Sequence, residues 1–246
     1  MKTKKEKHFV SVMIAALNEE KNIQRTIKET LRIKKYYNLE VLVVLDSKTT
    51  DRTAEVSKKA GAKVIYTGKW LGKGAALRLA LPYAKGDIIV QMDADYQFMP
   101  YDIPRLVDPL FKGFDVALGS RYEKRAKVEK GSVTKLRRIG IFLLSFVTSV
   151  FCGQRITDMP AGFKAFKTAV LKDINMQTDH YGYEAEVIIK AAQKRYKIIC
   201  VPISYKKRVV GESKLIPFKD GYLFLRTILK FGFQPFFEKT IKVFSR

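Results

Sequence analysis

Short apolar runs rich in β-branched residues alternate with segments of helical spacing through the first half of this 246-residue chain. The strand-like runs cover residues 9–14, 40–46, 63–66, 87–93 and 115–120, and the helix-like segments cover 21–35, 49–62, 72–86 and 101–113. Such an alternation builds βαβ units, whose strands lie parallel in one sheet. The sequence therefore predicts an α/β fold, a Rossmann-like and mostly parallel sheet flanked by helices.

Polar residues follow these runs where each predicted strand ends. Glu19 follows the first run, Asp46 ends the second, Asp93 and Asp95 follow the fourth, and a glycine-rich turn at 72–74 opens a helix. Parallel sheets bind their ligands beyond the carboxyl ends of the strands. The positions together predict one ligand site at that edge of the sheet.

The second half of the chain shows no repeat and no low-complexity linker, so one compact unit is expected. Its longest apolar run, 139–152, falls short of the roughly 20 residues that span a bilayer, and no transmembrane helix is expected. A basic stretch at 121–138 predicts a mobile loop. We expect a catalytic domain over 1–215 and C-terminal amphipathic helices over 216–246, where apolar and basic residues mix at helical spacing.

The stretch QMDADYQ places Asp93, Asp95 and Gln97 two residues apart. In extended backbone such residues point to one side. Carboxylate and amide oxygens suit Mg²⁺ or Mn²⁺, which often bridge substrate phosphates. The alternative is a solvated loop with a helix-capping aspartate. The preceding apolar strand favours the metal site.

Two further strand-end features bear on nucleotide binding. Asp46 is suited to accept hydrogen bonds from a base or a ribose, or else to cap the next helix. The stretch LGKGAAL places backbone N–H groups and Lys73 at a helix start, which favours anions. It lacks the spacing of a Walker A motif, and alone it is a weak signal.

The formal net charge of +23 points to a polyanionic partner: nucleic acid, anionic lipid or phosphorylated substrate. Residues 121–246 carry most of it, with 26 basic against 10 acidic side chains. A Lys-rich surface without functional meaning is the alternative. No RNP, helix-turn-helix or zinc-finger signature supports a nucleic-acid-binding protein. Cys152 and Cys200 lie in apolar surroundings, which favours free thiols in a reducing compartment.

An ordered set of motifs resembles the family 2 glycosyltransferases of the GT-A fold, most closely the dolichyl-phosphate (polyprenyl-phosphate) mannose and glucose synthases. The matching blocks are MIAALNEEKNI, VVLDSKTTDRT, GKGAAL, DIIVQMDADYQ, LGSRY, DMPAGFKAF, YGYEAEV and VPISYKKRVVGESK. They follow the family's order from about residue 9 to 215. As a set they are highly specific, although no single block is.

The resemblance implies a role for each matching residue. A nucleotide-sugar would be bound by Ala15, Leu17, Glu19, Asp46, Lys73, Asp93, Ala94 and Asp95, and a divalent metal by Asp93, Asp95 and Gln97. Phosphates of acceptor or donor would be bound by Arg121, Arg137, Arg138, Arg208, Ser213 and Lys214. The catalytic set would be Asp95, Arg121, Asp158 and Arg208, with Glu184 also near the sugar.

The departures from the family pattern leave parts of the chemistry open. The block AALNEE lacks the usual proline and tyrosine, and LDSKTT replaces paired acids and a glycine. These two departures leave open whether the donor nucleotide is GDP or UDP. Ile141 stands where a serine often follows the two arginines, which affects the acceptor contacts.

The expected function is an inverting transfer of mannose or glucose to polyprenyl or dolichyl phosphate. A phosphate monoester is already anionic near neutral pH, with a second pKa near 6, and needs no strong general base. Only His8 and His180 are present, which fits this acceptor. A soluble or glycan hydroxyl acceptor, with Asp158 or Glu184 as the base, is the alternative. We expect a cytoplasmic protein, peripheral on the inner membrane face, bound to anionic lipid or to a separate membrane protein.

Overall fold

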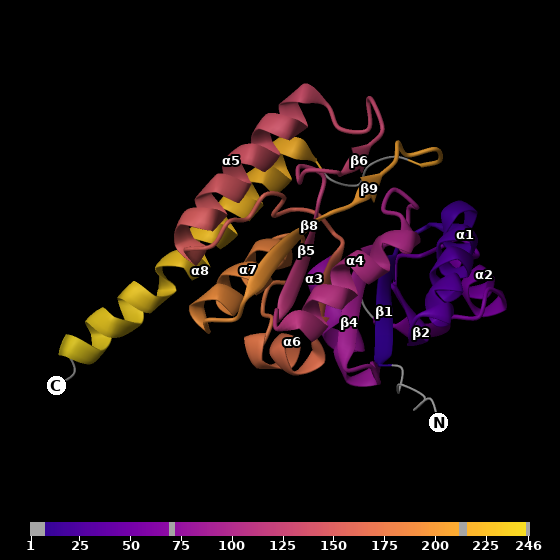
Figure 1. Cartoon of the computed structure of the whole chain (residues 1–246), viewed down its shortest axis with the longest axis horizontal. Coiled ribbons are helices and arrows are strands. Elements are labelled where there is room, and N and C mark those ends of the chain that lie inside the picture. Colours follow the sequence, from indigo (N-terminus) through magenta and orange to yellow (C-terminus); the bar gives the residue numbers. More distant parts are fainter. Residues whose placement is uncertain (1–7, 69–71, 212–215, 245–246) are drawn as a thin grey trace.

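The computed structural model describes residues 8–68, 72–211 and 216–244 and is built around a seven-stranded sheet (Figure 1). The strands are β1 (Phe9–Ala16), β2 (Asn38–Leu45), β3 (Lys63–Tyr66), β4 (Ile88–Asp93), β5 (Val116–Ser120), β7 (Lys164–Lys167) and β8 (Ile198–Pro202). They run in the order β3-β2-β1-β4-β7-β5-β8, and β7 alone among them is antiparallel to its neighbours. The predicted α/β fold with a mostly parallel sheet is confirmed.

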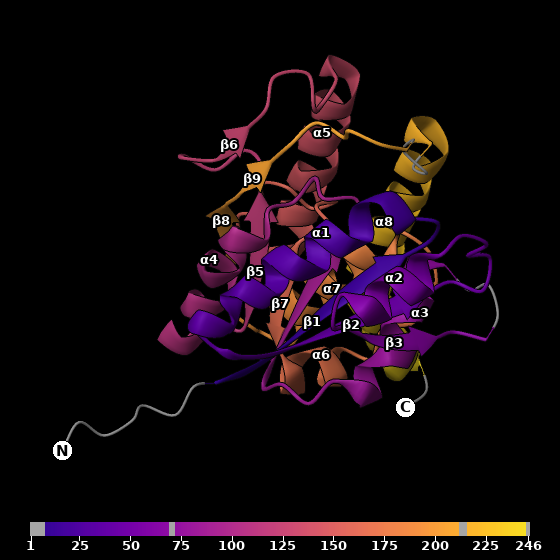
Figure 2. The same cartoon turned by 90° about the vertical axis from the view of Figure 1, so that its right-hand side faces the viewer.

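Helices cover both faces of the sheet. The α-helices are α1 (Glu20–Leu31), α2 (Thr53–Lys59), α3 (Lys73–Ala80), α4 (Ile103–Val107), α5 (Lys135–Cys152), α6 (Thr168–Ile174), α7 (Tyr183–Gln193) and α8 (Pro217–Phe244). Short 3₁₀ turns occupy Arg32–Lys35, Leu81–Tyr83, Pro100–Asp102 and Asp108–Lys112. One core cluster joins α1, α2 and α4 to the sheet, and a second joins α3, α6, α7 and α8 to its other face (Figure 2).

Helix α5 lies outside this second layer, packed on α7 and α8. In Figure 1, α5 and α8 lie together along one side of the molecule, and the end of α8 extends beyond the body. The C-terminal segment is thus one helix where the sequence suggested several. None of the described helices combines the length and apolarity that crossing a bilayer requires.

A second, two-stranded sheet pairs β6 (Lys127–Val128) with β9 (Ser204–Tyr205). The sequence predicted a mobile loop over 121–138, and the strand pair was missed there. Because the two strands are short and far apart in the chain, no local pattern announces their pairing. This small sheet anchors the segment that leads to Arg208.

The cysteines agree with the expectation of free thiols. Cys152 and Cys200 are both unpaired and partly buried. Burial raises the pKa of each thiol, so neither has the thiolate character of a reactive cysteine.

The register of the sheet brings the carboxyl ends of β1, β2 and β4 to one edge. Ala15 pairs with Asp93 on one side and with Val44 on the other. The residues that follow these strands therefore meet at the same edge, as the sequence predicted. Helix α3 begins beside them, against the loop that leads into α7.

Two helical glycines give a matched stability test of that packing. A Cβ at Gly74 in α3 would collide with the Thr178 carbonyl oxygen and lie 2.8 Å from Tyr183 Cβ, whereas a Cβ at Gly140 in α5 meets nothing within 4 Å. Gly74→Ala should lower the free energy of unfolding by about 1–3 kcal/mol. Gly140→Ala should raise it by about 0.5–1 kcal/mol. Urea unfolding measures both, and equal effects would contradict this packing.

Candidate active site

A cavity of about 630 Å³ opens over the carboxyl ends of the strands. One part is lined by residues that the sequence singled out, most of them at strand ends: Ala15, Leu17, Glu19, Asp46, Lys73, Asp93, Ala94, Asp95, Gln97, Arg121 and Arg208. The other part is lined by apolar residues of α5 and α8, among them Leu136, Ile139, Leu143, Leu144, Phe218 and Phe224. The cavity thus joins a charged end to an apolar end.

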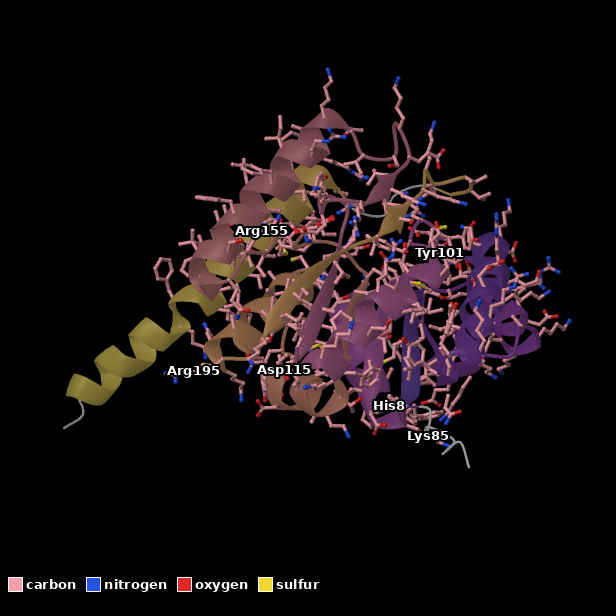
Figure 3. The ribbon with its side chains drawn as sticks, in the orientation of Figure 1. His8, Lys85, Tyr101, Asp115, Arg155 and Arg195 are labelled. Carbon is pink, nitrogen blue, oxygen red and sulfur yellow. The ribbon has the colours of Figure 1, made fainter. Side chains whose placement is uncertain are left out.

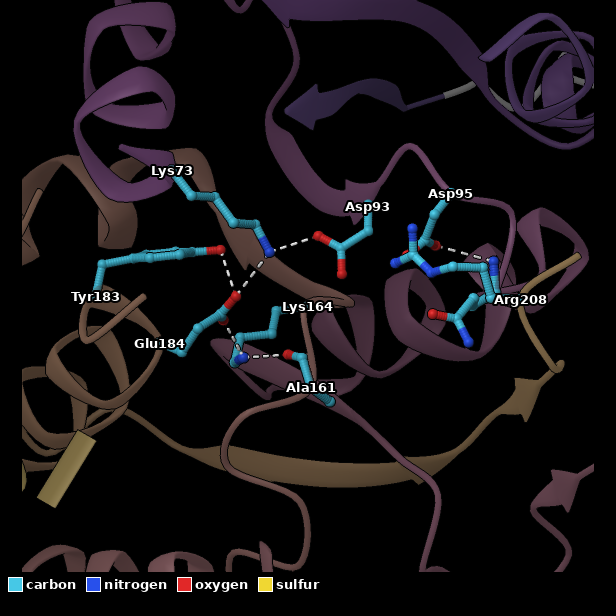
Figure 4. A network of polar contacts seen from close by, with 9 residues as sticks. Lys73, Asp93, Asp95, Ala161, Lys164, Tyr183, Glu184 and Arg208 are labelled. Atoms are coloured by element: carbon cyan, nitrogen blue, oxygen red, sulfur yellow. Dashed lines mark hydrogen bonds and ion pairs between the residues drawn. The ribbon is translucent and has the colours of Figure 1, made fainter. Parts of the chain in front are cut away.

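Each carboxylate of the acidic pair is met by a cation of the protein (Figure 4). Lys73 Nζ lies 2.5 Å from Asp93 Oδ1, and the guanidinium of Arg208 pairs with Asp95. Burial and the neighbouring Asp93 carboxylate raise the pKa of Asp95 to about 6, although Arg208 lowers it in part. The pair is therefore a site where added positive charge is favourable.

The backbone leaves the extended conformation after Asp93, where β4 ends. Tyr96 adopts a left-handed φ of 59°, which is uncommon for a residue with a Cβ. The turn lets the Gln97 N–H donate to Asp95 Oδ1 at 3.0 Å, while Gln97 Nε2 donates to the Lys206 carbonyl at 3.0 Å. Asp93, Asp95 and Gln97 are therefore brought together by a turn and not by a straight strand.

Glu184, in the first turn of α7, is a buried carboxylate held by three donors. Lys73 Nζ lies at 3.0 Å, the Tyr183 hydroxyl donates at 2.6 Å, and Lys164 of β7 also donates. Burial alone would raise the pKa of Glu184, but the two ammonium groups lower it. Lys164 is itself fully buried and donates to the Ala161 carbonyl as well.

Arg121 and Asp158 form a second buried pair. Arg121 Nε and Nη2 donate to the two Asp158 oxygens at 2.7 and 2.8 Å, and the Arg121 N–H adds a bond at 2.9 Å. Burial works against the charge of Arg121, but Asp158 outweighs it and raises the pKa of the guanidinium. Arg121 lines the cavity, whereas Asp158 is fully buried beneath it.

The charged part of the cavity extends over the ends of β1 and β2, where Glu19 and Asp46 line it. Glu19 Oε2 accepts from Asn22 Nδ2 at 2.9 Å, and Asp46 Oδ1 accepts from the Lys48 N–H at 2.9 Å. Asp46 follows β2 as predicted, and it caps its own turn instead of the next helix.

The other predicted residues fall in three groups. Arg137 and His180 line the cavity, and Arg138 lies next to Arg137 in the first turn of α5 without lining it. Ser213 and Lys214 lie outside the described residues.

The sequence analysis missed two features of the site. It missed Lys164, because a lysine in a short strand gives no sign of burial, and it missed the apolar side chains of α5 that line the cavity.

The residues present fit a divalent cation. Two carboxylates and an amide are oxygen donors of the kind that Mg²⁺ and Mn²⁺ prefer. Gly162 leaves room beside them, since a Cβ there would lie 2.5 Å from Asp93 Oδ2 and 2.7 Å from Lys73 Nζ. Within the described part of the chain, no group of three or more His, Cys, Asp or Glu side chains could hold a metal, so a cation here would also need oxygens from water or from a bound ligand.

Solved structures share this fold. A glucosyl-3-phosphoglycerate synthase from Mycobacterium tuberculosis, in complex with Mn²⁺, uridine diphosphate and phosphoglyceric acid, superposes with a TM-score of 0.72 and 20% identity over 92% of this chain and 78% of that one. The same synthase with Mg²⁺ and uridine diphosphate gives a TM-score of 0.69. The fold is therefore that of the GT-A glycosyltransferases.

Sequence relatives extend over most of the chain. A dolichyl-phosphate hexose transferase of Haloferax volcanii is 30% identical over 90% of this chain and 92% of its own length. A dolichol-phosphate mannosyltransferase of Pyrococcus furiosus is 32% identical over 84% of this chain and 59% of its own length. The sequence model of Glycosyl transferase family 2 matches residues 11–174. The chain is a glycosyltransferase and belongs to family 2.

Proposed function

We propose that this glycosyltransferase moves a hexose, mannose or glucose, from a GDP- or UDP-sugar to polyprenyl or dolichyl phosphate with inversion at the sugar C1. The observation that carries the proposal is the two-part cavity. Its charged end suits a nucleotide-sugar, and its apolar end between α5 and α8 suits the chain of a lipid acceptor. The relatives named for dolichyl-phosphate substrates support it.

The donor would lie over the ends of β1, β2 and β4. Glu19 and Asp46 would accept hydrogen bonds from the base and ribose, and Lys73 would lie near the diphosphate. Asp93, Asp95 and Gln97 would hold Mg²⁺ or Mn²⁺, which neutralises the leaving diphosphate when bound. Mn²⁺ and Mg²⁺ accompany uridine diphosphate in the mycobacterial synthase, which supports a divalent cation here.

The burial of the two candidate base carboxylates, Asp158 and Glu184, argues for a phosphate acceptor. Asp158 is fully buried and bonded to Arg121, and Glu184 is held by two lysines and a tyrosine. Neither lines the cavity. An anionic phosphate oxygen can attack C1 directly, the bond from C1 to the donor phosphate breaks, and the nucleoside diphosphate leaves with the electron pair. No proton transfer is needed, and Arg121, Arg137 and Arg208 would orient the acceptor phosphate, with Arg138 nearby.

The apolar surface of α5 and α8 supports attachment to a membrane. Helix α5 exposes Ile139, Phe142, Leu143, Phe146 and Val150, and α8 exposes Phe218, Tyr222, Leu225, Leu229 and Phe233. Both sets recur at helical spacing, and basic residues such as Lys135, Lys219 and Arg226 lie among them. Apolar burial and attraction to anionic lipid would bind such helices at the cytoplasmic membrane face. The division into a catalytic domain over 1–215 and an interfacial segment over 216–246 is part of this proposal.

A soluble phosphorylated acceptor is the second candidate. The mycobacterial synthase with the same fold carries phosphoglyceric acid, which shares a phosphate with the lipid acceptor. A donor screen with GDP-mannose, UDP-glucose and UDP-N-acetylglucosamine, with polyprenyl phosphate present, separates the two. Labelled sugar should enter the organic phase, and label that stays aqueous with every donor would exclude the lipid acceptor.

Asp95→Asn should lower turnover by a factor on the order of 100 or more, because it removes a charge that holds the metal. Asp87→Asn, at the exposed opposite end of β4, is the matched control and should keep full activity. Initial rates across a Mn²⁺ titration measure both, and circular dichroism checks folding. Unchanged activity in Asp95→Asn would show that the site is misplaced.

Gly140→Leu should raise the KM for polyprenyl phosphate by about tenfold or more. Gly140 lines the cavity, and a Cβ there meets open space, so a larger side chain would occupy the path proposed for the lipid. Val150→Leu, on the same helix outside the cavity, is the control. An unchanged KM in Gly140→Leu would move the lipid to another path.

Replacing Phe142 and Phe146 together by Ser should weaken binding to vesicles that contain anionic lipid by about tenfold or more. These side chains are 68% and 59% exposed and lie outside the cavity lining. Tyr101→Ser is the control, since Tyr101 is also exposed but lies away from α5 and α8 (Figure 3). Co-sedimentation measures binding, and equal binding of both variants would contradict the membrane face.

A further inference from the structure

The charges of the acidic pair are balanced by Lys73 and Arg208, and these two cations differ in their other partners. Lys73 is 14% exposed and bonded both to Asp93 and to Glu184, and Glu184 is itself fixed by Lys164. Arg208 is bonded to Asp95 and lies 3.8 Å from Glu19, so both of its carboxylate neighbours are residues of the cavity. In Figure 4 the two cations reach the acidic pair from separate parts of the chain.

The backbone that carries Arg208 is fixed just before it. Tyr205 bridges to Phe98, and the Lys206 N–H donates to the Gln97 carbonyl at 2.8 Å. Gln97 Nε2 returns a bond to the Lys206 carbonyl at 3.0 Å. Val209, the next residue, is 89% exposed. The guanidinium thus reaches Asp95 on a long side chain whose backbone is fixed just before it.

Arg208 and a divalent cation need the same oxygens of Asp95. A metal at the acidic pair would therefore compete with Arg208, whereas Lys73 would keep Glu184 as a partner. We infer that Arg208 is an exchangeable counter-cation: it closes Asp95 until the metal and donor bind, and is then released toward the acceptor phosphate. The inference rests on the proposed function for its metal site and deepens it by linking the filling of that site to the release of Arg208.

Competition of this kind is reciprocal. The free energy of the Arg208–Asp95 ion pair is lost when the metal binds, so this ion pair lowers the affinity for the metal. The metal weakens the ion pair by the same factor. A residue that only helped to bind the donor would leave the affinity for the metal alone unchanged. The change in metal affinity therefore separates the two roles.

The first experiment measures Mn²⁺ binding without nucleotide, from the electron paramagnetic resonance signal of free Mn²⁺. Arg208→Gln should bind Mn²⁺ about tenfold more tightly than the wild-type protein. Arg208→Lys, which keeps the charge, should stay closer to the wild type. Arg155→Gln is the control, since Arg155 (labelled in Figure 3) is exposed and pairs with Glu123, and neither residue lines the cavity. Unchanged or weaker binding in Arg208→Gln would overturn the inference.

A double-mutant cycle assigns the effect to Asp95. In an Asp95→Asn background, the exchange of Arg208 for Gln should no longer change Mn²⁺ affinity, because the shared oxygens have lost their charge. A tightening that persists in this background would mean that Arg208 acts through another group and would also overturn the inference.

A second readout uses the wild-type protein and does not depend on the folding of any variant. Phenylglyoxal modifies accessible arginines, and peptide mass spectrometry gives the extent at each one. Mn²⁺ should raise the modification of Arg208 several-fold and leave that of Arg155, which is 72% exposed, unchanged. Arg208 modification that stays constant or falls would contradict release.

These measurements use neither sugar nor lipid. Failure of the lipid-acceptor assay would therefore leave the exchange standing, with a soluble phosphate as the acceptor. Loss of the Mn²⁺ effect would leave lipid transfer standing and remove only the role given to Arg208.

Discussion

The site depends on the ion pairs that the buried carboxylate of Glu184 makes with Lys164 and Lys73. Glu184 lies in the second core layer, yet it stays charged because Lys164 and Lys73 both reach it. An ion buried without partners would cost several kcal/mol, and removal of one partner of such a set costs about 3–5 kcal/mol. The arrangement ties α7 to β7 and to the start of α3, and through Lys73 it extends to Asp93. The same set of ion pairs therefore stabilises the core and positions the acidic pair of the site.

Much of the fold could be predicted because its signals are local. The alternation of strands and helices, and the polar residues after each strand, follow from short patterns such as VLVVLD and IIVQMD. The antiparallel insertion of β7 and the pairing of β6 with β9 join residues far apart in the chain. No local pattern carries that information, so these features could not be predicted.

The candidate site also has one part that local sequence patterns predict and another part that they do not. The carboxylates of Asp93 and Asp95 follow directly from the strand that precedes them. Their surroundings do not: the buried state of Lys164 depends on elements that meet only in the folded chain. The resemblance to a family placed Arg208 among the residues expected to bind phosphates, but only the structure shows that it pairs with Asp95. Sequence motifs identified the groups, and packing decided which groups meet.

The two-part cavity has a consequence for kinetics. If the acceptor is carried in a bilayer, as proposed, its relevant concentration is a mole fraction in the membrane, whereas the donor is counted per volume of water. Diluting the acceptor with inert lipid would then slow the reaction even at constant total acceptor. Diluting the suspension with buffer that holds the same donor concentration would leave the rate per membrane-bound enzyme unchanged. On this proposal, an enzyme whose cavity joins an acidic strand edge to the apolar side chains of α5 and α8 would work at a boundary between two solvents.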